Sequence, residues 1–360
     1  MPARSNGMVA SRVDANAQEA TFVSLTKVCV GGAKFNTLPR IFGCNILLCA
    51  DPKRPYNLND CVFGGQMELA RTDLMQVRTL LHESDPLTMA VYLKALQEGQ
   101  ADVSVAAQTR QKAERLGWVY ADRAALTPIG WFAADSLREY FFWRERARKL
   151  PFADAIPEVI HETLAGRHVL EIGSGSGMNL MSLAHVTKSV TGLEPVPIYR
   201  QIGGVLAEVE GLSHVVARDG RAEALPFEAE QFDTVLCVSA HQYFDMVPAF
   251  REIARVLRPG GEVVLISGTW SRYLLGSAHQ VLTGLSAAKN YVVTVVNTAS
   301  YMAMRRKILV RPSKWTTAYP IYPARWAIVG LLREAGLTMV GPPERRAGET
   351  IFRARKVTRG

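Results

Sequence analysis

The sequence feature that most constrains the fold is the glycine-rich segment Val169–Gly177, which reads VLEIGSGSG. An apolar run passes into the pattern acid-x-G-x-G-x-G, starting at Glu171, so we expect a strand, a tight turn and then a helix. Glycines there let the backbone bend sharply and let a ligand approach without meeting a Cβ atom. A dehydrogenase-type G-x-G-x-x-G motif would need glycine in place of Met178. Glu194, 17 residues past Gly177, ends the next expected strand, where an acid can accept both hydroxyls of a ribose.

Strands and helices are expected to alternate from residue 168 onward, which is the pattern of an α/β domain with a parallel sheet. Apolar runs predict strands at 168–172, 189–193, 214–217, 232–238, 262–267 and 350–356. Apolar residues at helical spacing predict helices at about 246–257 and 325–335.

The region before this domain is expected to be helical. Apolar residues recur at helical steps between about residues 66 and 150, and Thr127 followed by Pro128 is an N-cap signal, with Leu126 placed to pack on Trp131. Two short extended pieces precede that helix, so the order resembles a winged helix. We expect a mobile leader over residues 1–20, a helical, winged-helix-like domain over 21–150 and the α/β domain over 151–360.

Composition excludes several classes of protein. Of the 360 residues 48% are hydrophobic and 21% charged, so neither wholesale disorder nor a fibrous repeat is expected. Apolar runs all fall short of the roughly 18 residues that a membrane-spanning helix needs. The first residues lack the apolar core of a signal peptide. The five cysteines form no C-x-x-C pair, so we expect reduced thiols, no metal site and a cytoplasmic location.

The positive charge of the chain is concentrated in one segment. The formal net charge is +9, and residues 268–324 contain seven Lys or Arg residues and no Asp or Glu. Seven of the nine net charges therefore come from 57 residues. A basic segment of this kind predicts that an anionic ligand or surface comes near it.

Three further motifs accompany the glycine turn: AEALPF at 222–227, FDTV at 232–235 and LRPGG at 257–261. With them the chain resembles the class I S-adenosylmethionine-dependent methyltransferases, especially the small-molecule branch that includes ubiquinone and menaquinone methyltransferases. The resemblance covers residues 166–269 and 325–356. It implies a Rossmann-like, seven-stranded sheet and S-adenosylmethionine as the cofactor.

The resemblance also implies which residues bind the cofactor. In the family, the acid of the glycine motif lies near the methionine end and the second-strand acid holds the ribose. Where the family usually has an acid for the adenine amino group, this chain has Arg221, so either Asp219 or the backbone N–H of Ala222 is expected to hold the adenine. The expected set is Glu171, Gly173, Ser174, Gly175, Gly177, Glu194, Asp219, Ala222, Glu223 and Ser239.

The segment Ser239–Asp245, SAHQYFD, follows the fourth expected strand, whose carboxyl end faces the ligand in this fold. It resembles the segment that carries the general-base histidine of plant-type O-methyltransferases, which also have a winged-helix dimerisation domain. Histidine suits that role because its ordinary pKa of about 6.5 lets it accept a hydroxyl proton near neutrality. Two interpretations stay open: His241 is the catalytic base, or it only contacts the cofactor or substrate. Tyr243 is expected to contact the substrate.

Residues 268–324 leave the fifth expected strand on the ligand side of the sheet, so we expect a lid there. Arg305 and Arg306 are expected to bind the substrate. Three interpretations of the lid stay open: a clamp on a carboxylate or phosphate, a contact with an anionic bilayer, or a solvated charged face. Its first part has apolar residues spaced as one face of a helix, at Leu274, Ala278, Val281, Leu282 and Leu285.

We therefore expect a homodimeric enzyme that transfers a methyl group to a small molecule, to a hydroxyl in particular, on an anionic or lipid-like acceptor. The alternative is a ligand-sensing DNA-binding regulator with an idle methyltransferase domain. Its recognition helix, at about 104–116, would offer Arg110, Lys112 and Arg115 against Glu114. The motifs of DNA methyltransferases, an Asn-Pro-Pro-aromatic run or a Pro-Cys pair, are absent, so nucleic acid is not an expected substrate.

Overall fold

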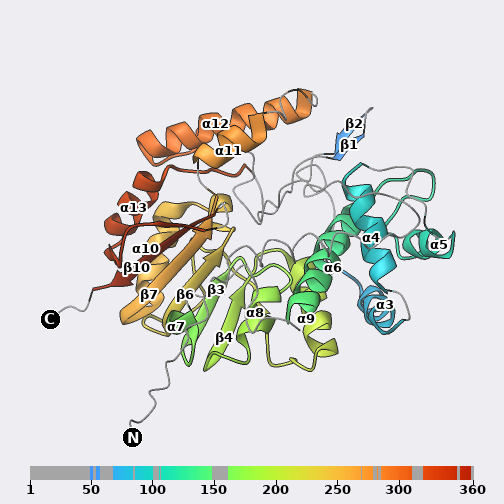
Figure 1. The fold of residues 1–360 in the computed structure, drawn as a ribbon, viewed down its shortest axis with the longest axis horizontal. Coiled ribbons are helices and arrows are strands. Elements are labelled where there is room, and N and C mark those ends of the chain that lie inside the picture. The colour runs from blue at the N-terminus through green and yellow to red at the C-terminus, as the bar shows by residue number, and fades with distance from the viewer. Residues whose placement is uncertain are drawn as a thin grey trace, which may run out of the picture. The chain divides into compact units, whose positions relative to one another are not determined.

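The computed structural model describes residues 49–51, 54–56, 68–83, 86–99, 105, 107–147, 161–268, 270–278, 282, 285–309, 319–346 and 349–357. These residues all belong to one compact unit. The expected leader lies outside them. A short antiparallel pair, β1 (Cys49–Asp51) and β2 (Arg54–Tyr56), comes first. Four helices follow (Figure 1): α3 (Arg71–His82), α4 (Pro86–Gln97), α5 (Ala107–Arg115) and α6 (Pro128–Ala147).

The strands that follow form a mixed sheet with the order β5-β4-β3-β6-β7-β10-β8. Figure 1 labels its central part, β4, β3, β6, β7 and β10. Strands β3 to β7 run parallel to one another, whereas β10 is antiparallel to both β7 and β8. The main order contains the seven strands that were expected, and a three-residue strand, β9, pairs with β10 outside that order. The strands are β3 (His168–Ile172), β4 (Ser189–Leu193), β5 (Ala217–Arg218), β6 (Phe232–Val238), β7 (Leu257–Ser267), β8 (Leu337–Met339), β9 (Glu344–Arg346) and β10 (Glu349–Lys356).

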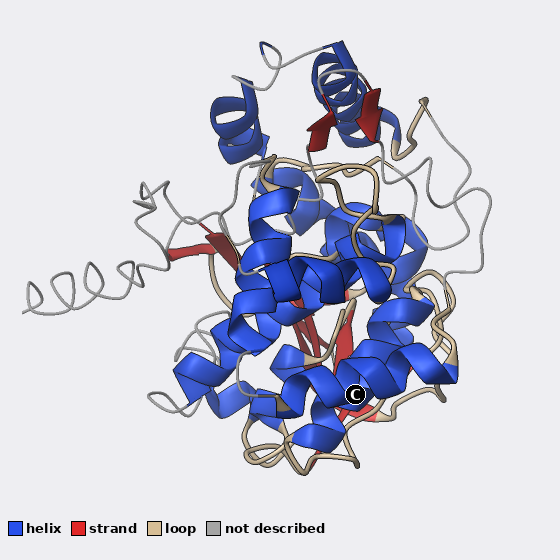
Figure 2. Ribbon diagram, turned by 90° about the vertical axis from the view of Figure 1, so that its right-hand side faces the viewer, coloured by secondary structure: helices blue, strands red, loops and turns tan. Residues whose placement is uncertain are grey.

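Helices cover both faces of this sheet (Figure 2), and the alternation of side chains along the strands explains why. In β3, Leu170 and Ile172 face the core that α10 (Met246–Val256) and α13 (Arg325–Glu334) complete, whereas Val169 faces α7 (His161–Leu164) and α8 (Met178–Leu183). The same two-residue period holds in β6, β7 and β10. Strands buried on both faces are continuous apolar runs, so they could be recognised in the sequence.

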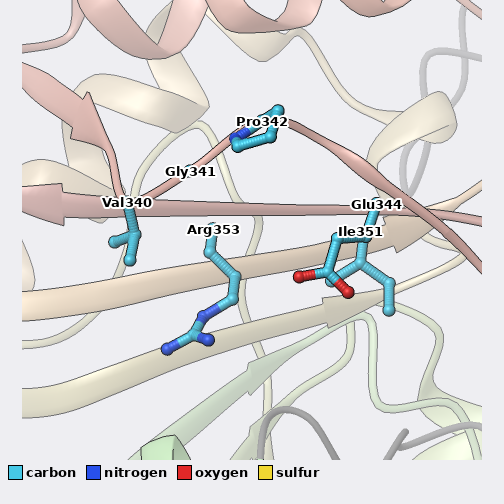
Figure 3. A pocket seen from close by; sticks show the side chains of 6 residues that line it. All are labelled: Val340, Gly341, Pro342, Glu344, Ile351 and Arg353. Atoms are coloured by element: carbon cyan, nitrogen blue, oxygen red, sulfur yellow. The ribbon is translucent and has the colours of Figure 1, made fainter.

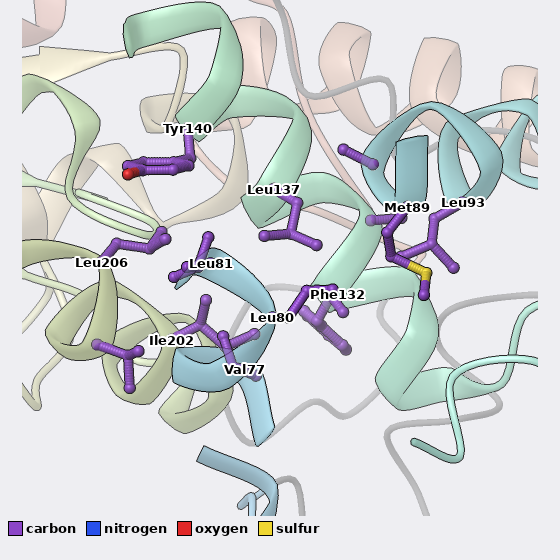
Figure 4. Packing of buried hydrophobic residues seen from close by; sticks show 14 of the residues in the cluster. Val77, Leu80, Leu81, Met89, Leu93, Phe132, Leu137, Tyr140, Ile202 and Leu206 are labelled. Carbon is purple, nitrogen blue, oxygen red and sulfur yellow. The ribbon is translucent and has the colours of Figure 1, made fainter. Parts of the chain in front are cut away.

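Helices α3 to α6 do not have a hydrophobic core of their own. Val77, Leu80 and Leu81 of α3 pack in the same apolar cluster as Ile202 and Leu206 of α9 (Pro197–Val209) (Figure 4). The cluster also takes in buried residues of α4, α6 and α8. The α3–α6 region and the first part of the α/β domain are thus held together by shared hydrophobic burial.

The expected start of α6 is confirmed. The hydroxyl of Thr127 accepts a hydrogen bond from the N–H of Gly130 at 3.1 Å, and both Leu126 and Trp131 are buried. Where a two-stranded wing was expected, the structure has a single antiparallel bridge between Val119 and Leu126.

Two helices, α11 (Trp270–Ser277) and α12 (Leu285–Met304), follow β7. The expectation of one amphipathic helix through residues 274–285 is wrong, because α11 ends at Ser277 and both Leu282 and Leu285 are exposed. Val281 lies outside the described residues. None of the helices in the described part of the chain is long and apolar enough to cross a bilayer.

Candidate active site

The order of the strands in the sheet indicates where a ligand would bind. The chain moves outward from β3 through β4 to β5 in one direction, and from β6 to β7 in the other. In open α/β sheets, ligands bind at the carboxyl ends of the strands where the order reverses, here between β3 and β6. The last residues of β3 and the segments that follow β3, β4, β5 and β6 contain all ten residues expected to bind the cofactor, together with His241 and Tyr243.

The turn after β3 is tight and open on one side. Gly173, with a φ of 74°, lies against the loop after β6, and a Cβ atom added there would come within 2.3 Å of the Cβ atom of Ala240. Gly175, with a φ of 54°, has no described atom within 4 Å of the position that a Cβ atom would take. Gly173 is therefore needed for packing, whereas Gly175 leaves space for a ligand.

Glu194 follows β4 and is buried. Its Oε2 accepts a hydrogen bond from the N–H of Gly175 and its Oε1 from the N–H of Val196, both at 2.9 Å. Burial nevertheless raises the pKa of this carboxyl to about 7, against the opposing effect of the two N–H groups and of Arg200. A carboxylate has about four lone-pair positions, so each oxygen can still accept another hydrogen bond.

Glu171, at the end of β3, is only 1% exposed. Its Oε1 accepts a hydrogen bond from Nδ2 of Asn179 at 2.6 Å. Its Oε2 is buried without a hydrogen-bond partner among the described residues. Burial raises the pKa of Glu171 to about 7, and the charge of Glu194 adds to this rise. Sequence reasoning missed Asn179, for which the only signal is its place in the first turn of α8.

The residues after β5 lie near Arg200 of α9, another residue that the sequence did not single out. Its Nη1 forms an ion pair with Oδ1 of Asp219 at 2.9 Å and also donates to the backbone oxygen of Glu194. Ala222 is buried, and the side chain of Asp219 is exposed. Arg200 therefore connects the ends of β4 and β5, and which group holds an adenine stays a prediction.

The loop after β6 carries His241, whose side chain is fully buried in a short 3₁₀ turn, His241–Tyr243. Neither ring nitrogen has a hydrogen-bond partner among the described residues. Burial lowers the pKa of His241 to about 4, so its imidazole is neutral near pH 7. Ser239 begins this loop with a φ of 50°, a strained conformation for a residue with a side chain.

The same loop is tied to α10 and α12. The carboxylate of Asp245 accepts hydrogen bonds from the N–H of Val247, at 3.2 Å, and from the hydroxyl of Tyr301, at 2.6 Å. Oε1 of Glu223 accepts the N–H of Asp245 at 2.9 Å. The backbone oxygen of Gln242 accepts the N–H of Ile321 at 3.0 Å. The loop that carries His241 is thus held from two sides, one of them the region expected to be a lid.

The three consecutive basic residues of the expected lid have different surroundings. Arg305 forms an ion pair with Glu334 of α13 at 2.8 Å, and Arg306 is exposed. Lys307 is buried and donates a hydrogen bond to the backbone oxygen of Tyr319 at 3.0 Å. They do not form one continuous charged surface.

Buried polar atoms without partners indicate where a ligand fits. Among the described residues, such atoms include Oε2 of Glu171, Oγ of Ser174, both ring nitrogens of His241 and Oε1 of Gln242. All four residues belong to the loops after β3 and β6 or to the strand end that leads into them. Each such atom costs free energy unless a ligand or water pairs with it. With the space beside Gly175, these atoms fit a polar cofactor of the expected kind.

Two other features do not add to this site. A small open pocket lies beside β10, lined by Val340, Gly341, Pro342, Glu344, Ile351 and Arg353 (Figure 3). The guanidinium in this pocket is already engaged through Nη2, because this nitrogen of Arg353 donates to Thr163 and Glu262 at 2.9 and 3.1 Å. Within the described ranges, no three His, Cys, Asp or Glu residues are grouped as a metal site would require.

Comparison with known proteins identifies the class of domain. Residues 170–265 match the family model described as a methyltransferase domain. This segment runs from β3 to β7 and contains the site described above. The chain therefore has a Rossmann-like α/β methyltransferase domain, and the expected resemblance is confirmed at this level.

Particular relatives match part of the chain. An uncharacterized methyltransferase, YcgJ of Bacillus subtilis, is 31% identical over 106 residues, 29% of this chain and 42% of the relative. A phthiotriol/phenolphthiotriol dimycocerosates methyltransferase of Mycobacterium leprae is 36% identical over 103 residues, 28% of this chain and 37% of the relative. A methyltransferase structure from Methanosarcina mazei has 18% identity and a TM-score of 0.42, covering 57% of this chain and 99% of the other. The chain spans less than half the length of these two curated relatives.

Proposed function

We propose that this protein transfers a methyl group from S-adenosylmethionine to a small-molecule acceptor. One observation carries the proposal: buried polar atoms without partners, on Glu171, Ser174 and His241, gather at the carboxyl ends of β3 and β6 in a methyltransferase domain. Bound S-adenosylmethionine supplies an electrophilic methyl group on a positively charged sulfur. The task of the protein is to align the acceptor with that methyl group, and such alignment accounts for much of the rate of a transfer reaction.

In this proposal, Glu194 accepts hydrogen bonds from the ribose hydroxyls, and its two backbone N–H partners hold the carboxylate in place for them. Glu171 presents its Oε2 toward the methionine end. Gly175 lets the cofactor pass close to the backbone. Either Asp219 or the N–H of Ala222 receives the adenine.

We further propose that the acceptor atom is a hydroxyl oxygen and that His241 takes its proton. Support comes from the neutral imidazole, which keeps a lone pair for a proton at physiological pH. Because burial also disfavours the imidazolium, the proton is expected to move together with the methyl group and not before it. The competing role, in which His241 only contacts the ligand, predicts that the acceptor is a carbon or nitrogen atom.

The acceptor is proposed to be anionic or lipid-like. The basic segment 268–324 supports an anionic molecule or surface. The name of the Mycobacterium leprae relative refers to dimycocerosates. By analogy with that name, a lipid-like acceptor for this chain is part of the proposal.

The N-terminal region is proposed to be winged-helix-like and to support a homodimer. The order of three helices, an antiparallel bridge and a long helix is consistent with such a module. A regulator that binds DNA through α5 is the weaker candidate, because Arg110 pairs with Glu114 at 2.9 Å and Lys112 pairs with Glu83. Sedimentation velocity with and without duplex DNA tests both points, and a monomer that binds DNA would contradict them.

The direct test uses the purified full chain with S-adenosylmethionine carrying an isotopic label in its methyl group. A metabolite and lipid extract is added, and mass spectrometry follows any molecule that gains the labelled methyl group. We expect a labelled product together with S-adenosylhomocysteine. If calorimetry detects no binding of S-adenosylhomocysteine to the folded protein, the proposal fails.

A further inference from the structure

The helix α12 buries several polar side chains, together with Val293 and Tyr301, and leaves several apolar side chains exposed on its opposite face. Thr294, Asn297, Thr298 and Ser300 are buried. On the opposite face, Leu285 is 92% exposed and Val292 53% exposed. Exposed or half-buried positions recur along this outer face at steps of three and four residues, at Leu285, Lys289, Val292, Val296, Ala299 and Ala303.

The buried polar face is fixed by hydrogen bonds. Asn297 donates to the backbone oxygen of Leu309 at 2.8 Å and accepts the N–H of Leu309 at 2.9 Å. The hydroxyl of Thr298 donates to Thr294 and accepts the N–H of Tyr322. Turning the helix to bury its apolar face would break the bonds to Leu309 and Tyr322 and leave buried polar groups unpaired. The apolar face is therefore built to point outward.

More exposed apolar side chains lie close to this helix in the sequence. Of the twelve large apolar side chains that are exposed in the described part of the chain, seven lie between residues 282 and 326. At the end of α12, a hydrogen bond from the N–H of Ala324 to the sulfur of Met302 brings the start of α13, with its exposed Trp326, to the same end. The seven are Leu282, Leu285, Val292, Met304, Ile308, Leu309 and Trp326.

The basic residues near this surface indicate which kind of partner it binds. The segment 268–324 contains no acidic residue, and both Lys289 and Arg306 are exposed. A second copy of the chain would bring the same basic segment against itself in a symmetric contact. Exposed apolar side chains next to basic ones fit the surface of an anionic bilayer, where the apolar groups enter the acyl boundary and the cations meet lipid phosphates.

We propose that the outer face of α12, together with Leu282 and the exposed side chains of Met304, Ile308, Leu309 and Trp326, docks on an anionic phospholipid bilayer. The inference does not depend on methyl transfer, since it concerns a surface and not the reaction. If the proposed function also holds, the acceptor would be drawn from that bilayer.

The test is flotation of the full chain with vesicles of phosphatidylcholine alone and of equal parts phosphatidylcholine and phosphatidylglycerol. We expect binding to the anionic vesicles, weakened by added salt, and little binding to the neutral ones. Leu285→Glu combined with Val292→Glu should weaken binding at least about tenfold. Lys289→Gln combined with Arg306→Gln should weaken it roughly 30-fold, because each basic residue near such a surface contributes about fivefold.

Two matched controls change the same kinds of side chain elsewhere. Met75→Glu with Leu87→Glu replaces exposed apolar residues on α3 and α4, and Arg71→Gln with Arg251→Gln removes two exposed charges. Both should bind vesicles like the wild type. If the wild type ignores anionic vesicles, or the α12 variants bind them as well as the controls do, the proposal is overturned. A homodimer that Leu285→Glu with Val292→Glu dissociates, without vesicle binding, would also overturn it. Calorimetry with S-adenosylhomocysteine on the same samples tests the proposed function separately.

Discussion

Two buried carboxyls, Glu171 and Glu194, dominate the site at the scale of single residues. Both have pKa values raised to about 7 by burial, whereas the unfolded chain would ionise them near 4.5. The folded protein therefore binds more protons than the unfolded chain between these values. The stability that protonation contributes is fully present below about pH 4.5 and is lost as the pH rises through 7. Ionisation of these two carboxyls therefore lowers the stability of the folded protein at neutral pH and above. Such a loss of stability is expected where a binding site is preformed for a ligand.

The first prediction concerns the stability that the protein loses when Glu171 ionises. Glu171→Gln keeps an oxygen for Asn179 but removes the buried charge, so it should raise the free energy of unfolding at pH 8 by about 1–3 kcal/mol. At pH 5 the difference should largely disappear. Urea unfolding at both pH values measures it, with the exposed Glu98→Gln as the control. Equal stability of variant and wild type at pH 8 would show that the buried charge of Glu171 does not destabilise the folded protein.

The second prediction concerns cofactor binding. Glu194→Ala removes an acceptor for a neutral diol, so its affinity for S-adenosylhomocysteine should fall by about 10- to 150-fold, equivalent to about 1.5–3 kcal/mol. Protonation removes acceptor capacity too, so the affinity of the wild type should fall as the pH drops from 8 to 6, through the pKa of about 7. Titration calorimetry measures both, with the exposed Glu230→Ala as the control. An unchanged dissociation constant would remove Glu194 from the site.

The third prediction concerns His241. His241→Ala should lower turnover by about 10²–10⁴ while the affinity for S-adenosylhomocysteine stays nearly the same. Because the pKa of His241 is lowered to about 4, protonation of this residue should reduce the turnover of the wild type only near pH 4. His168→Ala is the matched control, since this residue lies at the opposite end of β3. Wild-type turnover in His241→Ala would make carbon or nitrogen methylation the better assignment.

At the scale of elements, the link between α12 and the loop after β6 is the feature with functional weight. The hydroxyl of Tyr301 donates to Asp245 and accepts the N–H of Val247, so it fixes the start of α10 next to the His241 turn. Tyr301 is a positioning residue in this arrangement, because it acts on the site through Asp245.

The fourth prediction tests this link. Tyr301→Phe keeps the ring but removes the hydrogen bond to a carboxylate, so stability should fall by about 1.5–3 kcal/mol. Turnover should fall as well, with little change in the affinity for S-adenosylhomocysteine. Tyr291→Phe, on the same helix, is the control, and thermal unfolding with steady-state kinetics gives both readings. If stability falls but turnover does not, Tyr301 supports the fold only.

The sequence predicted those parts of the site that follow directly from strand ends. The glycine turn, Glu171 and Glu194 each sit next to an apolar run, and the N-cap at Thr127 is equally local. Residues whose roles come from contacts across the fold were missed. Tyr301 meets Asp245 across 56 positions of the chain, and no periodicity marks such a contact.

At the scale of the whole molecule, net charge described the basic segment only coarsely. The sequence counts Arg305, Arg306 and Lys307 as equal charges, but the first is paired and the third is buried. The contribution of a charge to an outer field depends on its exposure and partners, which composition does not contain. The outward apolar face of α12 was likewise hidden, because the sequence pattern alone favours burying it.

The cluster that joins α3, α4 and α6 to α8 and α9 has a consequence for how this architecture can change in evolution. A fragment that began at β3 would lack helices α3 to α6 and would leave Ile202 and Leu206 uncovered. Exposed apolar patches of this kind promote aggregation. The methyltransferase domain is thus not a portable module in this chain. Any recombination that transplants it into another protein would have to carry the preceding helices along, or replace them with a new cover of matching shape.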